Sequence, residues 1–274
     1  MTHKLARVAR AWHILRTRGL SGFFNRIQWY FQRWWLSDNW LLGKLVELRG
    51  NPVTLDGCQF DLSSSRILTV QKAGFWVGNY EIKERIAVKQ IPSSGLPIVE
   101  LGGGIGVVSC VTSKHFGNPA RHVVVEANPN MIPIITRQRD LNGCQFTVIP
   151  ANLSYDGQEV PFHVSAKFLA STALDVPNQE SEVVYVPATT LGAILDQYGF
   201  DQIVLICDIE GAEVSLFEHE SDLLGSRVQY LVLEYHPNLT SQDAVQTIMK
   251  RLAALGFAKV YQGKDNYLYR HETL

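Results

Sequence analysis

A run of roughly 18 to 20 apolar residues, which a membrane-spanning helix needs, is missing from the 274-residue sequence. The start of the chain also lacks the apolar block of a secretory signal, because five basic residues are scattered through the first twenty. The four cysteines are far apart and form no CxxC pair, which argues against a zinc cluster or a disulfide framework. These absences predict a cytoplasmic protein with reduced thiols.

Acidic residues are absent from residues 1–37, which hold seven Lys or Arg, whereas residues 38–274 hold 18 basic and 26 acidic residues. Five of the six tryptophans lie in the first forty residues. Apolar residues recur there at helical spacing, so we predict that residues 1–45 form a helical extension with basic polar faces. Nucleic acid is not an expected partner, because the acidic remainder would repel phosphates.

Two interpretations of this extension stay open. In the first, residues 1–37 bind an anionic membrane surface with their tryptophan rings at the headgroups, which would hold the protein on the inner face of a membrane. In the second, the helices pack on the rest of the chain, or on a second subunit of a homo-oligomer. The sequence alone does not decide between them.

The overall composition, 46% hydrophobic and 19% charged, is that of a folded domain. Residues 46–94 predict a small β-rich segment, with strand-like runs at Val53–Leu55 and Ile67–Val70 and a helix from Glu81 to Lys89. In residues 95–274, strands and helices alternate, which predicts a mostly parallel sheet with helices on both faces. The last two strands are too close for a crossover and should form an antiparallel hairpin. We therefore predict a Rossmann-like α/β sheet of the class I methyltransferase type.

A glycine-rich loop follows the first strand of this sheet, which ends at Leu101, and precedes a helix. Gly102, Gly104 and Gly106 are expected to let a cofactor approach the backbone and the free N–H groups of the helix. A dinucleotide fingerprint would need glycine at position 107, where the sequence has Val107. The loop therefore favours S-adenosylmethionine over a nicotinamide dinucleotide.

Acidic and amide side chains mark the ends of the first three strands. Glu100, beside the glycine loop, would repel a pyrophosphate but suits the ammonium group of a methionine moiety. Glu126 ends the second strand, where an acid typically binds ribose hydroxyls, and Asn128 follows it. Asn152 follows the third strand, where the adenine ring is expected. The long stretch Tyr155–Thr189 is predicted to form a hairpin and a loop over the site.

The fourth strand runs into three carboxylates within six residues, at the sheet edge where such folds bind ligands. This segment and two others resemble the FkbM family of S-adenosylmethionine-dependent methyltransferases, over residues 78–274. The matching segments are Asp208-Ile209-Glu210-Gly211-Ala212-Glu213, Gly78-Asn79-Tyr80-Glu81 and Leu233-Glu234-Tyr235-His236-Pro237. The chain departs from the family pattern at Glu100, Gly103, Gly104, Gly192 and Ile206.

The resemblance implies methyl transfer to an oxygen, such as a hydroxyl of a sugar, a glycolipid or a specialised metabolite. A hydroxyl is a poor nucleophile and needs a base or a metal. The candidates for this step are Asp208, Glu210, Glu234 and His236. In one hypothesis His236 or Asp208 is the general base. In another, Asp208, Glu234 and His236 hold Mg²⁺ or Mn²⁺.

Tyr80 and Glu81 have two interpretations: they close over the methionine end of the cofactor, or they pin the preceding segment to the sheet. Two alternatives to methyl transfer also stay open. One is a nicotinamide-dependent oxidoreductase, against which Val107 and the terminal hairpin argue. The other is a non-catalytic, cofactor-binding adaptor held at a membrane by the basic extension.

Overall fold

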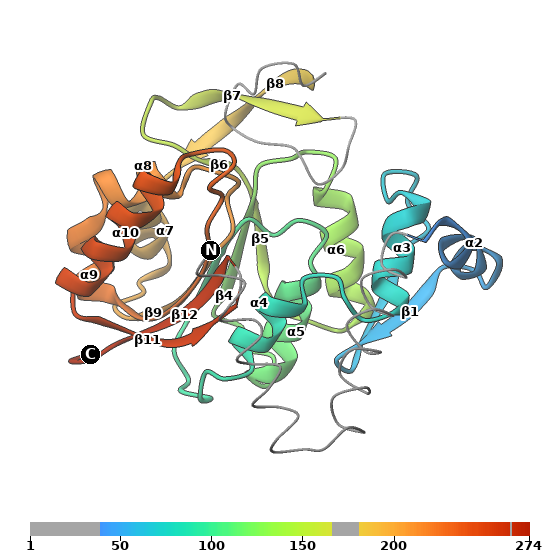
Figure 1. The fold of residues 1–274 in the computed structure, drawn as a ribbon, viewed down its shortest axis with the longest axis horizontal. Coiled ribbons are helices and arrows are strands. Elements are labelled where there is room, and N and C mark those ends of the chain that lie inside the picture. The colour runs from blue at the N-terminus through green and yellow to red at the C-terminus, as the bar shows by residue number, and fades with distance from the viewer. Residues whose placement is uncertain (1–38, 166–180, 264) are drawn as a thin grey trace, which may run out of the picture.

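The computed structural model describes residues 39–165, 181–263 and 265–274 (Figure 1). The helices expected in residues 1–37 therefore lie outside the described residues, as does the middle of the predicted loop over the site. None of the described helices is long and apolar enough to cross a membrane. All four cysteines are buried and unpaired.

A seven-stranded sheet forms the centre of the protein, in the order β11-β12-β10-β9-β3-β4-β5. The strands are β3 (Ile98–Leu101), β4 (His122–Glu126), β5 (Thr147–Pro150), β9 (Ile203–Cys207), β10 (Val228–Glu234), β11 (Phe257–Gln262) and β12 (Asn266–His271). Strands β10, β9, β3, β4 and β5 run parallel, and β12 pairs antiparallel with β10 and β11. This topology confirms the predicted Rossmann-like methyltransferase sheet.

Helices cover both faces of the sheet because successive strand residues point to opposite sides. Along β3, Val99 and Leu101 belong to one apolar core, whereas Ile98 belongs to another. The first core is closed by α7 (Leu191–Tyr198), α8 (Glu213–His219), α9 (Ser221–Arg227) and α10 (Gln242–Ala254). The opposite face is covered by α4 (Ile82–Val88), α5 (Val107–His115) and α6 (Ile132–Leu141).

A small subdomain precedes the sheet and packs beside α5 and α6 (Figure 1). It contains α2 (Trp40–Leu48), the antiparallel hairpin of β1 (Pro52–Leu55) and β2 (Cys58–Asp61), and α3 (Thr69–Trp76). The strand predicted at Ile67–Val70 is wrong, because α3 begins at Thr69. The Gln71 side chain accepts the Leu68 N–H at 2.8 Å and so satisfies a backbone donor at the helix start.

A second hairpin rises above the carboxyl ends of the central strands (Figure 1). It consists of β7 (Glu159–Ser165) and β8 (Ser181–Thr189), and β8 also pairs with the short β6 (Asn152–Leu153). Val160, Phe162 and Val164 of β7 share a small apolar cluster with Val186 of β8. The hairpin is therefore held by its own core, and it stands over the sheet edge where the polar residues gather.

Candidate active site

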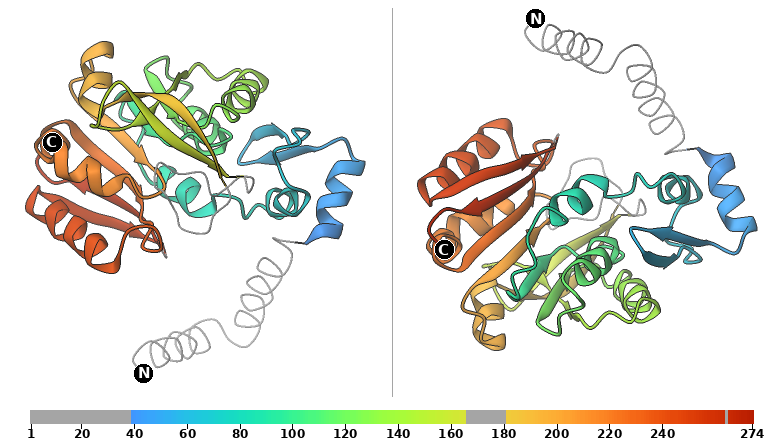
Figure 2. Two further views of the ribbon diagram at one scale, coloured as in Figure 1. Left: turned by 90° about the horizontal axis from the view of Figure 1, so that it is seen from above. Right: turned by 90° about the horizontal axis from the view of Figure 1, so that it is seen from below.

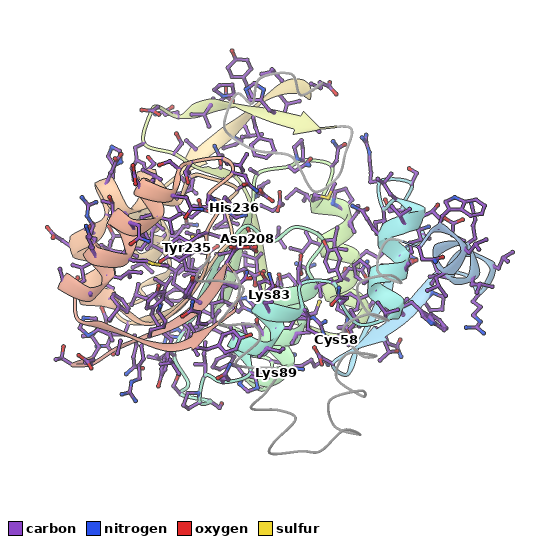
Figure 3. All side chains as sticks on the ribbon, viewed as in Figure 1. Cys58, Lys83, Lys89, Asp208, Tyr235 and His236 are labelled. Atoms are coloured by element: carbon purple, nitrogen blue, oxygen red, sulfur yellow. The ribbon has the colours of Figure 1, made fainter. Side chains whose placement is uncertain are left out.

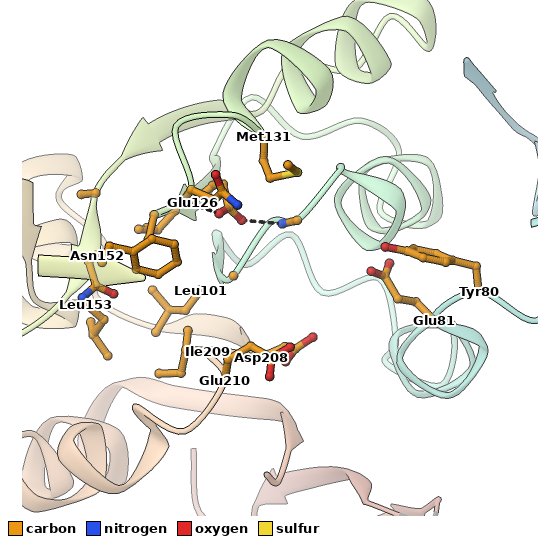
Figure 4. A pocket seen from close by; sticks show the side chains of 17 residues that line it. Tyr80, Glu81, Leu101, Glu126, Met131, Asn152, Leu153, Asp208, Ile209 and Glu210 are labelled. Atoms are coloured by element: carbon orange, nitrogen blue, oxygen red, sulfur yellow. Dashed lines mark hydrogen bonds between the residues drawn. The ribbon is translucent and has the colours of Figure 1, made fainter. Parts of the chain in front are cut away.

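A pocket opens at the carboxyl ends of β3, β4 and β9, with Phe162 of the β7–β8 hairpin in its wall (Figure 4). Its polar lining side chains come from segments that are far apart in the sequence: Tyr80, Glu81, Glu126, Asn128, Asn152, Asp208 and Glu210. All of these residues were predicted from the sequence as site residues. The parallel strands bring them together because each of those strands ends at the same edge.

The glycine loop passes directly against the end of β9. A Cβ atom on Gly102 would lie 1.7 Å from the Asp208 carbonyl oxygen, so only glycine fits there. Gly104 lines the pocket and donates its N–H to Glu126 Oε2 at 2.6 Å. Gly106 is not among the residues that line the pocket; it precedes α5 with a φ of 86° and packs against Ile135 of α6. The loop thus exposes Gly102 and Gly104 to a ligand, whereas Gly106 shapes the turn.

The Glu126 carboxylate is held by backbone donors on both of its oxygens. Its Oε2 accepts the Gly104 N–H, and its Oε1 accepts the Asn128 N–H at 2.6 Å. Burial raises the pKa of Glu126 to about 7, although the hydrogen bonds from Asn128 and Gly104 act in the opposite direction. These contacts fix the carboxylate in one orientation facing the pocket.

The opposite wall is formed by Tyr80 and Glu81, which lie across the pocket from Glu126 (Figure 4). The Tyr80 ring stacks on Phe75, with the ring centroids 4.0 Å apart. Arg85 is buried and donates to the Tyr80 carbonyl at 2.9 Å and to the Gly78 carbonyl at 2.8 Å. Burial, with the nearby Glu100 charge, raises the pKa of Glu81 to about 8. Both interpretations of this pair, as a pocket wall and as a tie to the subdomain, fit the geometry.

Glu100 lies away from the pocket, contrary to its expected place beside the cofactor. It is only 1% exposed, and its Oε1 accepts the Ser109 hydroxyl of α5 at 2.7 Å. Its Oε2 lies 3.5 Å from His122 Nε2. The pleat of β3 explains this placement, because Leu101 points into the pocket and the preceding residue must point to the other face.

A histidine surrounded by carboxylates lies beside the pocket, where His236 and Asp208 are neighbours (Figure 3). His236 Nδ1 lies 2.8 Å from Oε1 of the buried Glu213, and a carboxylate oxygen can only accept, so Nδ1 carries the proton. The other ring nitrogen, Nε2, lies 3.3 Å from Asp208 Oδ1 and 3.5 Å from Glu210 Oε2. Glu213 therefore fixes the ring so that Nε2 faces the pocket.

The protonation of this cluster is set by burial and by like charges. Burial alone would lower the pKa of His236, but the hydrogen bond to Glu213 and the surrounding carboxylates raise it to about 9. Burial, followed by the charges of Glu234 and Glu210, raises the pKa of Asp208 well above its usual range. Burial also raises the pKa of Glu210 to about 7. This end of the pocket therefore favours a bound positive charge.

Two residues near this cluster, Glu84 and Asn266, were not predicted from the sequence. Glu84 of α4 is buried, accepts a hydrogen bond from the Asn266 amide, and is hydrogen-bonded to Glu234. Burial and this bond raise the pKa of Glu234 to about 8. Ligand atoms of Asp208, Glu234 and His236 all lie within 4.8 Å of one another. Two carboxylates and one imidazole have the donor chemistry of a site for a hard divalent ion.

The sheet order, the glycine loop and the acids at the strand ends together define a Rossmann-like methyltransferase. The sequence matches the family described as "Methyltransferase FkbM domain" over residues 100–259, which is more than half of the chain. The protein therefore belongs to the FkbM methyltransferase family. This confirms the resemblance seen in the sequence, and the family implies S-adenosylmethionine as the cofactor.

Solved structures with a similar fold share little sequence with this chain. A protein of the NADB-Rossmann superfamily from Streptococcus agalactiae has 16% identity and a TM-score of 0.41, with 70% of this chain and 69% of that chain covered. The ribosomal protein L11 methylase from Lactobacillus delbrueckii subsp. bulgaricus has 13% identity and a TM-score of 0.39, with 70% and 77% covered. Among curated proteins, none matches this sequence.

The residues present fit S-adenosylmethionine. The open Gly102–Gly104 backbone can lie against a ligand, and Glu126 faces the pocket as a fixed acceptor for ribose hydroxyls. Asp208 Oδ1 is buried and accepts no hydrogen bond from any residue that the structure describes. An unmatched carboxylate oxygen of this kind suits the positive charges of the methionine moiety.

Proposed function

We propose that the protein is an O-methyltransferase that methylates a hydroxyl group of a sugar, a glycolipid or a specialised metabolite. The observation that carries this proposal is the orientation of His236, whose Nδ1–H is held by Glu213 while Nε2 faces Asp208 beside the pocket. A base in this position can take the proton of a hydroxyl that lies in the pocket. The acidic surroundings suit a cationic cofactor next to it.

When bound, S-adenosylmethionine supplies a methyl group on a positively charged sulfur. The chain has to place the acceptor oxygen in line with that methyl group and to remove the hydroxyl proton. His236 Nε2 receives this proton directly or through Asp208, and Glu213 stabilises the imidazolium that forms. The β7–β8 hairpin, with Phe162 in the pocket wall, covers the site and contributes to acceptor selection.

Methyl transfer is tested with purified protein, S-adenosylmethionine carrying a labelled methyl group, and a panel of sugars, glycolipids and metabolite fractions. We expect base-stable labelled product from hydroxyl acceptors, and calorimetric heat with S-adenosylmethionine but not with NADH. Heat with NADH alone would make the protein an oxidoreductase. Binding of the donor without transfer to any fraction would instead favour the adaptor. Asp201→Asn, at an exposed acid, serves as the matched control for site variants.

A divalent ion at Asp208, Glu234 and His236 is the second way to activate the hydroxyl, and the closeness of their ligand atoms supports it. Activity in excess EDTA, compared with activity after adding Mg²⁺ or Mn²⁺ back, separates the two hypotheses. A general base acting alone predicts full activity in EDTA. A requirement for the ion predicts loss in EDTA and recovery with Mg²⁺ or Mn²⁺.

A further inference from the structure

We propose that the outer face of α2 docks onto a bilayer with anionic headgroups. Leu41, Leu45 and Leu48 lie on this face, spaced four and three residues apart, and together we call them the leucine stripe. Their exposed fractions are 67%, 50% and 82%. Figure 2 shows α2 at the edge of the molecule, away from the central sheet. The proposal concerns where the protein binds and does not depend on which acceptor is methylated.

The leucine stripe is not needed to hold α2 in the fold. The opposite face of the helix supplies that contact: Val46 is fully buried, and a Cβ atom on Gly43 would lie 1.8 Å from the Thr69 carbonyl oxygen of α3. A surface helix that only packs on its neighbour would carry polar residues outside. Here the outward face is apolar as well, which marks a surface that contacts something else.

Aromatic and basic residues border the leucine stripe in the arrangement that suits a membrane interface. Trp40 is 55% exposed and Trp76 is 44% exposed. The Lys44 ammonium lies 5.6 Å from the Trp40 ring centroid, and the Arg49 guanidinium lies 4.7 Å from that of Trp76. Indole rings favour the headgroup region, and Arg49 can bind a lipid phosphate, whereas Lys44 already pairs with Glu47 at 2.6 Å.

The sequence that precedes α2 strengthens the choice of an anionic bilayer. Residues 1–37 hold seven Lys or Arg and no acid, and this segment ends two residues before Asn39, the N-cap of α2. Three leucines alone give weak and reversible membrane binding, and stable attachment takes a second signal such as a polybasic segment. The two signals are adjacent in this chain, so they can act on one surface.

Two other possible partners of the leucine stripe, a second copy of the chain and the chain's own residues 1–37, fit less well. A second copy of the chain would need an interface of about 20 to 30 residues on each side, far more than this stripe and its border offer. The chain's own residues 1–37 would bring seven positive charges against a border that holds Arg49 and the Lys44–Glu47 ion pair. Like charges make that packing unfavourable, whereas an anionic lipid surface complements both.

The first test is vesicle flotation of the full-length protein. We expect it to float with phosphatidylcholine vesicles that contain phosphatidylserine, and not with phosphatidylcholine alone. The triple variant Leu41→Ser, Leu45→Ser, Leu48→Ser should bind about tenfold or more weakly. The control variant Leu141→Ser, Val260→Ser, at residues 47% and 50% exposed elsewhere, should bind like the wild type. Equal flotation of the triple variant and the wild type overturns the proposal.

The second test reports on α2 directly. The four native cysteines are buried, so an environment-sensitive dye can be attached selectively to Leu45→Cys, or to Val260→Cys as the control. We expect a blue shift of the Leu45→Cys dye when anionic vesicles are added, and none at position 260. No shift while the protein still floats would mean that residues 1–37 bind alone. A dye already shifted in buffer would mean that the stripe is covered by the chain itself or by a second copy. Either result overturns the proposal.

Discussion

The two acidic ends of the pocket differ in how their carboxylates are satisfied. At the end of β4, both oxygens of Glu126 accept backbone N–H groups at 2.6 Å. After β9, Asp208 Oδ1 accepts no hydrogen bond from the described residues, and Glu210 and Glu234 add negative charge around it. Among the ion pairs of the described residues, Asp208 has one partner, His236, whose Nε2 lies 3.3 Å from Asp208 Oδ1. The Glu126 carboxylate is therefore held by backbone donors, whereas the Asp208 side chain lies among other carboxyl groups with one histidine beside it.

This difference indicates that the two ends have different roles, one in cofactor binding and the other in proton transfer. A carboxylate fixed by backbone donors cannot move and is suited to hold a ligand in one orientation, so we assign cofactor binding to Glu126. Crowded carboxylates with raised pKa values, next to a histidine held by a third group, are the arrangement expected where a proton moves. We therefore expect substitutions at the Asp208 end to affect turnover, and those at Glu126 to affect cofactor affinity.

The largest effect is expected for Asp208→Asn. The variant keeps the shape of the side chain but replaces the carboxyl group that faces His236 Nε2 with an amide, which can neither take up nor release a proton. The value of kcat should therefore fall by about 10²-fold or more. The dissociation constant of S-adenosylmethionine should change far less. Steady-state kinetics and calorimetry measure the two effects, with Asp201→Asn as the control. Unchanged turnover would remove Asp208 from the chemical step.

A smaller loss is expected for Glu213→Gln, together with a shift of the pH profile. Burial lowers the pKa of His236, but the hydrogen bond to Glu213 and the charges of Glu213, Glu210 and Glu234 raise it to about 9, so a neutral residue in place of Glu213 should lower it. As a base, His236 must be neutral, so kcat/KM should rise with pH until the ring is deprotonated. In Glu213→Gln this rise should move to lower pH, and the plateau should fall about tenfold because the ring orientation is lost.

The exposed Glu218 lies on the same helix, so Glu218→Gln is the matched control for this experiment. Its profile should overlay that of the wild type. If Glu213→Gln lowered the plateau but left the position of the pH rise unchanged, Glu213 would be a packing residue and not the group that positions His236.

The sequence was sufficient to predict the polar residues that end parallel strands. Glu126 and Asp208 follow buried apolar runs, and strands of one parallel sheet must end at the same edge, so their meeting follows from the topology. Glu100 shows the limit of this reasoning. Its position in the chain places it near the loop, but the pleat of the strand decides which face of the sheet its side chain points to. A shift of one residue along the strand moves a side chain to the opposite face.

Contacts between distant segments could not be predicted. Glu84 and Asn266 are 182 residues apart, yet they are hydrogen-bonded beside Glu234. No local pattern marks Glu84, which in the sequence is one charged residue in a short helix. Glu213 was visible as an acid in the first turn of a helix, which is a common stabilising position. Only the three-dimensional structure shows that its partner is His236.

The next effect, on cofactor affinity and not on turnover, is expected for Glu126→Gln. The amide keeps one acceptor oxygen but presents an NH₂ group to a backbone N–H, and it binds ribose hydroxyls less strongly than a carboxylate. The dissociation constant of S-adenosylmethionine should rise about tenfold, while kcat at saturating cofactor should change little. Calorimetry against the exposed-site control Glu272→Gln measures the change. A loss of kcat with unaltered affinity for S-adenosylmethionine would contradict the assignment of cofactor binding to Glu126 and of proton transfer to the Asp208 end.

The smallest effect on the cofactor is expected for Glu100→Gln. This variant makes the same chemical change as Glu126→Gln, but in β3, which lies between β9 and β4 in the sheet. Glu100 is buried behind the pocket and accepts a hydroxyl from Ser109. The amide oxygen can keep that bond, so cofactor affinity should stay within about twofold, and only the free energy of unfolding should fall, by about 1 kcal/mol. Calorimetry and denaturant unfolding measure the two quantities. A tenfold loss of affinity, as large as that of Glu126→Gln, would show that Glu100 does face the methionine moiety when the cofactor is bound.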